Sequence, residues 1–458
     1  MESAMSDTMS GIAIFGLVAL IVHLFTRYFR TIVSIFAFLT YKPKPVLSNP
    51  TYRSSDVSVI IPTTFKTPQE LAQCVARILG NNPAAIFVVT ATANVPLVQD
   101  LLSLLASASA TTIKVLGVDV LNKRNQILKA MPEIQTEITV LADDDVFWPD
   151  HYLSYLLAIF EDPEVGAGGT RQRVRRNKNP DFWNFLGISY LERRVWNNCA
   201  TNAIDGSLST LSGRTAAYRT KILQHPDFYY YFTHDTWRGK PLNSDDDKCL
   251  TRYVYSHGHK IVLQFDPRAV IETTVEGDSK YLDQCMRWAR AHWRGNFTVM
   301  ENEKYWCSLR YLWGCYYIYL GQFQTPALLV DGMSFLLLSL ALWDATATTA
   351  RAAYIALACW IVFTKNLKLI PHFCKYPQDM RFIPIGIGFS YLHGLMNLYA
   401  AFTMKKTHWG SQNLSSLQQS RAANERVVPL LRNSISQPNS AHGMVGDDYF
   451  VAEQGKTV

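Results

Sequence analysis

The stretch EITVLADDDVFWPD, residues 137–150, decides the fold, because an apolar run typical of a buried strand ends in three consecutive aspartates. Adjacent carboxylates repel one another and are costly to remove from water. A solvated loop or the start of a helix would accommodate them without any further role. Their place at the end of a strand favours a ligand-binding edge instead, where a bound cation can neutralise them.

The segments around this stretch predict an α/β domain from about Asp56 to about Asn296. Short β-branched runs predict strands, and they are VSVIIP (57–62), AAIFVVTA (84–91) and TIKVLGVD (112–119). Helical spacing follows in QELAQCVARIL (69–79) and NKRNQILKAM (122–131). Strands that alternate with helices predict a parallel, doubly wound sheet, and such sheets bind ligands at the carboxyl ends of their strands.

Composition and charge exclude some classes of protein. The 458 residues are 48% hydrophobic and only 18% charged, which is apolar for a soluble protein. The net charge of +7 suits a membrane surface or a phosphorylated ligand, but no basic block is dense enough to indicate nucleic acid. The eight cysteines are scattered and form no CxxC motif, so we expect reduced thiols in a cytosol-like environment rather than disulfides.

The first apolar run, Gly11–Phe25, is expected to be a retained membrane anchor. A secretory signal peptide begins with basic residues, but Glu2 and Asp7 precede this run, and arginines and lysines follow it. The positive-inside rule therefore places the chain after the run in the cytosol. The next apolar run, residues 31–41, is too short to cross a bilayer alone and is expected to lie in the membrane interface.

Long apolar stretches return after Asn296, at 308–345, 352–363 and 383–402, and they are typical of membrane helices. We expect the last stretch to be interfacial or re-entrant, because a single crossing would place the following lysines on the wrong side. The predicted division is an anchor and interfacial segment over 1–50, a catalytic domain over 51–300, interfacial and transmembrane helices over 301–410, and a disordered cytosolic tail over 411–458.

Two acidic clusters carry residue types suited to chemistry. Asp143 and Asp145 alternate along an extended segment, so both point to one face and can bind Mg²⁺ or Mn²⁺ together with a diphosphate. A second cluster, Asp245, Asp246 and Asp247, directly precedes a helical segment. Capping of that helix would by itself explain the second cluster, so a structural role remains an alternative.

A third element is DQCMRWARAHWRGN, residues 283–296. If it is helical, Gln284, Arg287 and Trp288 lie on one face. A guanidinium group binds phosphate oxygens, and an indole ring offers a flat platform for a sugar. A snorkelling arginine and a core tryptophan beside a membrane would give the same pattern.

Together, VIIP, a D-x-D at a later strand end, DDKCLT and QCMRW occur in this order and are followed by membrane helices. This arrangement resembles the processive family 2 glycosyltransferases, namely the hyaluronan, cellulose and chitin synthases and the related fungal type 2 glycosyltransferases. The resemblance covers roughly residues 55–410. It implies a GT-A-like nucleotide-sugar-binding domain with a mixed, mostly parallel sheet, flanked by transmembrane and interfacial helices.

The resemblance also implies roles for individual residues. Asp247 is implied as the general base, beside Asp246. The nucleotide-sugar-binding positions are Thr63, Lys123, Asp143, Asp145 and Arg287, of which Asp143 and Asp145 also bind the divalent metal. The acceptor-binding positions are Ser212, Gly213, Gln284 and Trp288. The motif HWGS (His408–Ser411) resembles the W-G-T-R motif near the channel entrance of these enzymes.

The implied function is that of a membrane-bound inverting glycosyltransferase. It would use a UDP-sugar and Mg²⁺ or Mn²⁺ to extend a growing cell-surface or cell-wall polysaccharide, and would export it from a cytosolic site at the plasma membrane. Two segments depart from the family pattern, since TTFKT (63–67) lacks the usual acid and FVVTATAN (87–94) lacks the aspartates that contact the base. The altered base-recognition strand favours one alternative, an inactive scaffold of a synthase complex. A second alternative is a non-processive transferase that makes a glycolipid or a short oligosaccharide, which product length would distinguish.

Overall fold

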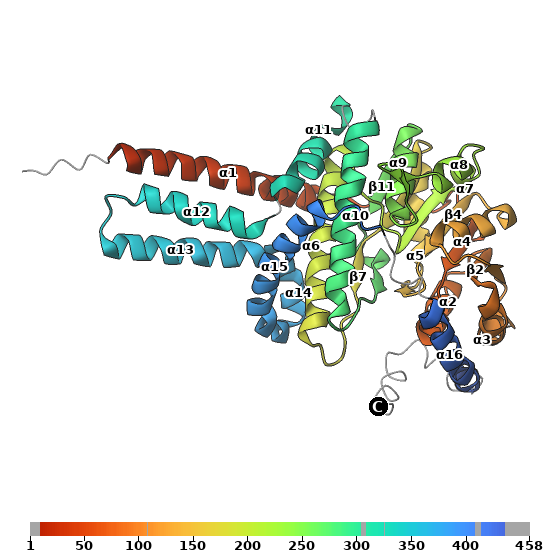
Figure 1. Cartoon of the computed structure of the whole chain (residues 1–458). Coiled ribbons are helices and arrows are strands. Elements are labelled where there is room, and N and C mark those ends of the chain that lie inside the picture. The colour runs from red at the N-terminus through yellow and green to blue at the C-terminus, as the bar shows by residue number, and fades with distance from the viewer. Residues whose placement is uncertain (1–9, 108, 304–307, 325, 408–413, 436–458) are drawn as a thin grey trace, which may run out of the picture.

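The computed structural model of the chain describes residues 10–107, 109–303, 308–324, 326–407 and 414–435 (Figure 1). A domain built on a seven-stranded sheet lies at one end, and a bundle of long helices projects from it. The HWGS motif predicted near a channel entrance lies outside the described residues.

The central sheet has the strand order β11-β6-β8-β4-β1-β2-β3. Its strands are β1 (Val57–Pro62), β2 (Ala85–Ala91), β3 (Thr112–Val118), β4 (Ile138–Ala142), β6 (Val165–Thr170), β8 (Thr215–Arg219) and β11 (Lys260–Gln264). All neighbouring pairs are parallel except those of β8, which runs antiparallel to both β4 and β6. The predicted mixed, mostly parallel sheet is therefore confirmed.

Helices cover both faces of this sheet because the strands are apolar on both faces. On one face, Ile60 of β1 packs in a cluster with Ile127 of α4 (Lys123–Ala130) and Leu250 of α9 (Asp246–Ser256). On the other face, Val59 packs in a cluster with Val75 of α2 (Pro68–Leu79). The remaining helices of this domain are α3 (Val95–Ser107), α5 (Tyr152–Leu157), α6 (Phe182–Asp205), α7 (Thr220–Leu223) and α8 (Phe228–Thr233).

A small three-stranded sheet extends the edge that carries the acidic triplet. Its order is β5-β12-β7, with β5 (Val146–Phe147), β12 (Ile271–Thr273) and β7 (Gln172–Val174). Because β5 begins directly after the triplet, residues 143–145 form the turn between the two sheets. A separate hairpin pairs β9 (Thr236–Trp237) with β10 (Lys240–Pro241).

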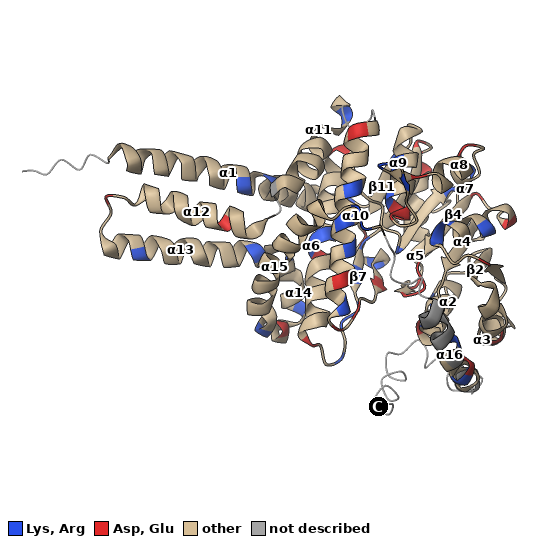
Figure 2. Cartoon of the chain, viewed as in Figure 1, with Lys and Arg blue, Asp and Glu red and all other residues tan. Residues whose placement is uncertain are grey.

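The projecting bundle consists of α1 (Gly11–Thr40), α12 (Ala327–Ala341) and α13 (Ala347–Asn366), which run side by side (Figure 1). They carry few charged residues (Figure 2). By length and composition, Gly11–Thr40 and Ala347–Lys375 can each cross a membrane. The segments Leu309–Phe323 and Ala327–Ala341, bent by 84°, could together form a third span.

The predicted break between an anchor and an interfacial segment near residue 30 is wrong, because α1 is one continuous helix of 30 residues. Arg27, in the polar stretch between the two predicted segments, finds a partner inside the bundle, because it forms an ion pair with Asp331 of α12. A polar stretch that finds partners on a neighbouring helix does not need to end the helix.

The C-terminal part of the chain returns to the sheet domain. Helices α10 (Lys280–Asn302) and α11 (Leu312–Gly314) precede α12 in the chain, and α14 (Ile370–Lys375) and α15 (Ile383–Phe402) follow α13. Helix α15 packs along α10, where the Trp293 indole donates to the Asn397 carbonyl oxygen at 3.0 Å. It is not among the described helices that pass as membrane spans.

The tail predicted to be disordered contains the helix α16 (Leu414–Ile435), so that prediction is wrong for these residues. Helix α16 packs against α2 and α3, and its Val428 is fully buried in the core cluster of that face. The abundance of Ser, Asn and Gln in the tail hides this single apolar stripe, which is stable only because the sheet domain covers it.

One buried ionic group joins the helices that later carry the site. Asp235 accepts from Arg124 of α4 at 2.9 Å and from Arg252 of α9 at 2.9 Å, and all three side chains are almost completely buried. The two helices are thereby fixed relative to each other. A buried carboxylate between two guanidinium groups cannot be removed without leaving uncompensated charge.

We therefore expect Asp235→Asn to lower the free energy of unfolding by about 3–5 kcal/mol. Thermal or urea unfolding of the purified chain in detergent measures the change. The matched control is Asp100→Asn, which removes an exposed ion pair with Arg432 and should cost less than about 1 kcal/mol. Equal stability of the two variants would contradict the structural role of Asp235.

Candidate active site

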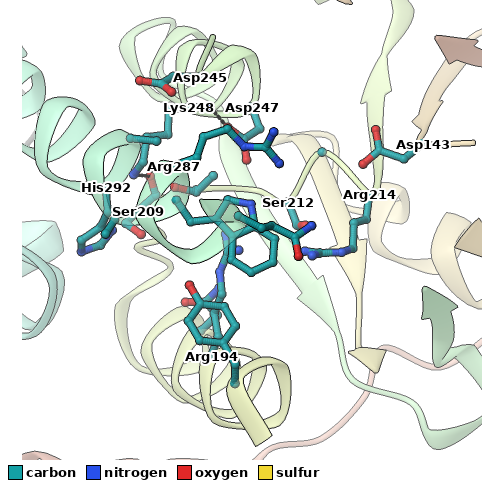
Figure 3. A pocket seen from close by; sticks show the side chains of 18 of the residues that line it. Asp143, Arg194, Ser209, Ser212, Arg214, Asp245, Asp247, Lys248, Arg287 and His292 are labelled. Atoms are coloured by element: carbon teal, nitrogen blue, oxygen red, sulfur yellow. Dashed lines mark hydrogen bonds between the residues drawn. The ribbon is translucent and has the colours of Figure 1, made fainter. Parts of the chain in front are cut away.

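A cavity of about 730 Å³ opens at the carboxyl ends of β1 and β4 and extends between α6, α9 and α10. It collects the two acidic clusters and the Q-x-x-R-W segment, which are far apart in the sequence. All eleven residues predicted from the sequence line it: Thr63, Lys123, Asp143, Asp145, Ser212, Gly213, Asp246, Asp247, Gln284, Arg287 and Trp288. Figure 3 shows side chains reaching it from different elements, such as Asp143, Asp247 and Arg194.

The three aspartates after β4 form a turn rather than the predicted extended segment, and each accepts a hydrogen bond from a different partner. Asp143 accepts from the Lys123 ammonium at 2.7 Å, and Asp144 accepts from the hydroxyl of Thr63. Asp145 accepts from the hydroxyl of Thr274 at 3.1 Å, in the segment that follows β12. The small sheet and the loop after β1 thus separate the carboxylates.

The acidic turn fits a hard divalent cation. Burial, together with the nearby charges of Asp143 and Asp144, raises the pKa of Asp145 to about 7. Burial likewise raises the pKa of Asp144 to about 6. Asp145 is therefore costly as an anion until a positive charge arrives, and Asp145 and Asp143, which line the cavity together, are the residues that could hold a metal ion here.

A second candidate metal cluster lies elsewhere on the surface. Among the described residues, His225, Asp227 and His257 are the group of three potential ligands whose ligand atoms lie within 4.8 Å of one another. They come from the segments around α8 and α9 and do not line the cavity. This group is therefore not part of the candidate active site.

The second acidic cluster is held at the start of α9 by a buried arginine. Asp245 has a positive φ of 63°, a strained conformation for a residue with a side chain. The guanidinium of Arg294 on α10 donates to both of its carboxylate oxygens, at 2.9 and 3.0 Å. This anchor directs the next two residues, Asp246 and Asp247, to the cavity.

Lys123 connects the two acidic clusters. Its ammonium lies 2.7 Å from Asp143 and 3.4 Å from Asp246. Burial alone would lower its pKa, but the two carboxylates outweigh burial and the pKa is raised. Lys123 is the first residue of α4, which is capped by the side chain of Asn122, so its position is fixed by the helix start.

The Ser212–Gly213 loop approaches these groups closely. Because β8 pairs with β4 in antiparallel register, the backbone N–H of Asp143 donates to the carbonyl of Arg214 at 2.9 Å. A Cβ atom on Gly213 would lie 3.0 Å from the Lys123 ammonium nitrogen and 3.5 Å from the Asp247 Cβ. The absence of a side chain at Gly213 therefore leaves room beside both groups.

The Q-x-x-R-W segment forms the wall of the cavity opposite α6. The Trp288 ring stacks on Tyr190 of α6, with the ring centroids 5.2 Å apart and the planes 20° apart. The Arg214 guanidinium lies 5.3 Å from the centre of the Trp288 ring. The side-chain oxygen of Gln284 is buried without a hydrogen-bond partner in the described part of the chain, so it can accept a bond from a ligand.

The sequence did not single out several residues of this site. Arg214 is buried against Trp288, and burial together with the charge of Arg194 lowers its pKa. The motif LSGR, in which Arg214 directly follows the Ser212–Gly213 loop, could have indicated it. Tyr190 carries no such signal, because only the packing of α6 against α10 brings it to the cavity.

Asn424 of α16 is a further residue that the sequence could not indicate. Its side chain donates to the carbonyl of Phe65 at 2.5 Å, in the loop after β1 that also carries Thr63. Phe65 is buried and has a positive φ of 56°. The C-terminal helix therefore holds a strained loop at the edge of the cavity.

Comparison with known proteins identifies the family. Residues 55–291, more than half of the chain, match the family described as "Glycosyltransferase like family 2". The chain belongs to this glycosyltransferase family. The matched range contains both acidic clusters and the Q-x-x-R-W segment.

This glycosyltransferase is similar to fungal proteins over most of its length. It is 42% identical to a type 2 glycosyltransferase of Zymoseptoria tritici, over 88% of this chain and 85% of that protein. It is 41% identical to a type 2 glycosyltransferase of Gibberella zeae, over 85% of this chain and 74% of that protein. The similarity to hyaluronan synthase of Streptococcus pyogenes is distant, at 22% identity over 63% of this chain and 66% of that protein.

A solved structure supports the fold. The mannosyltransferase PcManGT from Pyrobaculum calidifontis, in complex with GDP-Man and Mn²⁺, matches 83% of this chain and 98% of its own chain, with a TM-score of 0.50 and 18% identity. The predicted GT-A-like fold and the predicted transferase class are confirmed. The roles predicted for individual site residues stay predictions.

Gly213→Ala tests the close approach of this loop. The new methyl group would press on the Lys123 ammonium and fill the space next to Asp247, so transferase activity should fall by about 10- to 100-fold while the melting temperature changes little. The matched control is Gly277→Ala, because nothing lies within 4 Å of a Cβ there. Full activity of Gly213→Ala, measured as nucleotide release, would contradict the predicted crowding.

Proposed function

We propose that this family 2 glycosyltransferase transfers a sugar from a UDP-sugar to a growing cell-surface or cell-wall polysaccharide, with inversion at the anomeric carbon. The observation that carries the proposal is the convergence of Asp143, Asp145, Lys123, Asp247 and the Q-x-x-R-W segment on one cavity. The similarity to fungal type 2 glycosyltransferases and the distant similarity to hyaluronan synthase support it.

The donor end of the cavity is proposed to lie at the acidic turn. Asp143 and Asp145 would hold Mg²⁺ or Mn²⁺, and the bound ion would offset the charge that develops on the departing diphosphate. Lys123 and Arg287 line the same region and can donate hydrogen bonds to phosphate oxygens. Positive groups that are already in place when the bond breaks stabilise the transition state without reorganisation.

Asp247 is proposed to remove the proton from the acceptor hydroxyl. A nucleotide diphosphate is a good leaving group, so a single base is sufficient for an in-line displacement. Asp246 forms an ion pair with Lys123 at 3.4 Å, and no such pair joins Lys123 to Asp247 among the described residues. Asp247 is therefore the acid of this pair that is available to accept the proton. The space beside Gly213 lies next to Asp247 and can admit a hydroxyl group.

The stacked rings of Trp288 and Tyr190 are proposed to bind the acceptor sugar. Aromatic faces suit the apolar faces of sugar rings, and the free oxygen of Gln284 can accept from a sugar hydroxyl. An acceptor held there reacts in a positioned, effectively unimolecular step.

Export of the product through the membrane is the remaining part of the proposal. Helices α1, α12 and α13 leave the domain beside α6 and α15, which border the cavity (Figure 1). We propose that these helices cross the plasma membrane, with the sheet domain in the cytosol. Product length in reconstituted vesicles distinguishes this function from that of a non-processive transferase that makes a glycolipid or short oligosaccharide.

We expect Asp247→Asn to reduce turnover by about 10²- to 10⁴-fold while donor binding is retained, because the amide cannot accept the proton. Nucleotide release from the purified chain in detergent, with a panel of UDP-sugars and Mn²⁺, gives kcat for turnover and KM for the donor. The matched control is Asp283→Asn, an exposed acid of α10. Equal turnover of Asp247→Asn and the unaltered chain would remove Asp247 as the base.

The pH dependence follows from the surroundings of Asp247. Burial raises its pKa above the ordinary value, the charge of Asp246 raises it further, and the charges of Arg194, Lys248 and Lys123 oppose this rise. Because the base must be ionised, kcat/KM should fall as the pH drops through this raised pKa, at a higher pH than for an ordinary aspartate near about 3.9. A profile that stays flat down to the ordinary value would contradict this environment.

A further inference from the structure

The charges that line the cavity are unevenly distributed. Six carboxylates are among the described lining residues, and all belong to the two clusters 143–145 and 245–247. Eight lysines and arginines line the same cavity. A nucleotide-sugar diphosphate and a divalent cation offset each other's charge, so a bound donor leaves this excess of positive charge in place.

The excess lies where the membrane helices meet the cavity. Arg30 of α1 and Arg193 of α6 line the cavity there, and Lys368 lies behind them, donating to Asn197 of the lining. We call Arg30, Arg193 and Lys368 the basic end. Asn197 lies one turn after Arg193 on α6, and α1 packs along α6, so the three groups are neighbours.

The described residues provide no carboxylate for the basic end. The Nε atoms of Arg30 and Arg193 are buried and have no hydrogen-bond partner in the described part of the chain. The two acids on adjoining helices are already engaged: Glu192 is paired with Arg171, and Asp331 with Arg27 and Lys365. Instead, Arg30 lies over the ring of Tyr317 at 5.3 Å and Lys368 over that of Trp196 at 5.1 Å.

Arg30 and Arg193 are half-buried, and guanidinium groups that are partly removed from water without an anion are costly; burial lowers the pKa of Arg193 to about 10. An anion that enters from outside the chain and pairs with these guanidinium groups explains their arrangement. Guanidinium groups match the oxygens of a phosphate in charge and geometry, and two arginines from different helices can hold one phosphate from two sides.

We propose that the basic end binds a phosphate group carried by the acceptor. This inference rests on the proposed transferase function and names the class of its acceptor. Arg193 and Asp247 line the same cavity, so an acceptor with its phosphate at the basic end can extend a hydroxyl to the proposed base. Because Arg30 and Lys368 lie on the candidate membrane spans, a phosphate carried by a lipid can reach them from the bilayer, and a soluble sugar phosphate can reach them through the cavity.

The test measures binding of two phosphate probes to the full chain in phosphatidylcholine nanodiscs. UDP and Mn²⁺ are present in excess, so that the donor end is filled. One probe is phosphatidic acid in the nanodisc, and the other is soluble glucose 1-phosphate. Binding of the first assigns the phosphate to a lipid, and binding of the second assigns it to a soluble ester; either result supports the inference.

Arg193→Gln should weaken binding of the preferred probe by at least about tenfold, because a charged hydrogen-bond donor is lost. Arg193→Lys keeps the charge but loses the planar guanidinium group. It should bind the probe more weakly than the unaltered chain and more tightly than Arg193→Gln. The matched control is Arg351→Gln, an exposed arginine of α13, which should bind as the unaltered chain does. Arg30→Gln repeats the measurement if Arg193→Gln does not fold.

Two results would overturn the inference: neither probe binds, or both Gln variants at the basic end bind as tightly as Arg351→Gln. Donor turnover by the unaltered chain separates this failure from a failure of the proposed function. A chain that releases nucleotide from a UDP-sugar but binds no phosphate probe loses only the inference. A chain that turns over no donor loses the proposed function itself.

Discussion

The ammonium group of Lys123 lies between Asp143 and Asp246, and the rest of the site depends on this contact. The two carboxylates belong to separate parts of the chain, one after a central strand and one at the start of α9. Without a positive charge between them, burial and repulsion would drive them apart or protonate them. The lysine therefore keeps two acidic clusters within reach of one ligand, and the fold is arranged to hold it there.

Buried ion pairs support this arrangement of Lys123 and the two acidic clusters. Asp235 links α4, which carries Lys123, to α9, which carries Asp247. Arg294 of α10 holds Asp245 in its strained conformation, and it also donates to the carbonyls of Met404 and Lys406 after α15. Groups fixed in this way need little reorganisation when charge develops on a substrate, which is what transfer of a sugar from a diphosphate requires.

The charged residues of the cavity are also unevenly distributed. Carboxylates line the cavity after β4 and at the start of α9, and Arg30 and Arg193 line it where α1 packs along α6. An enzyme that joins a donor from water to an acceptor at a membrane needs two such ends, because the two substrates arrive from different surroundings. The charge distribution follows this division, and the stacked Trp288 and Tyr190 rings line the same cavity.

The sequence by itself determined the α/β class, the mostly parallel sheet, the glycosyltransferase family and the set of eleven residues that line the cavity, because strand ends and short motifs are local signals. It failed where the outcome depends on distant partners. Arg27 continues α1 because Asp331 of α12 neutralises it, and Val428 orders α16 because the sheet domain covers it. Only the tertiary structure decided that Arg30 and Arg193 share one buried end of the cavity, since burial and pairing are properties of the folded chain and of no single segment.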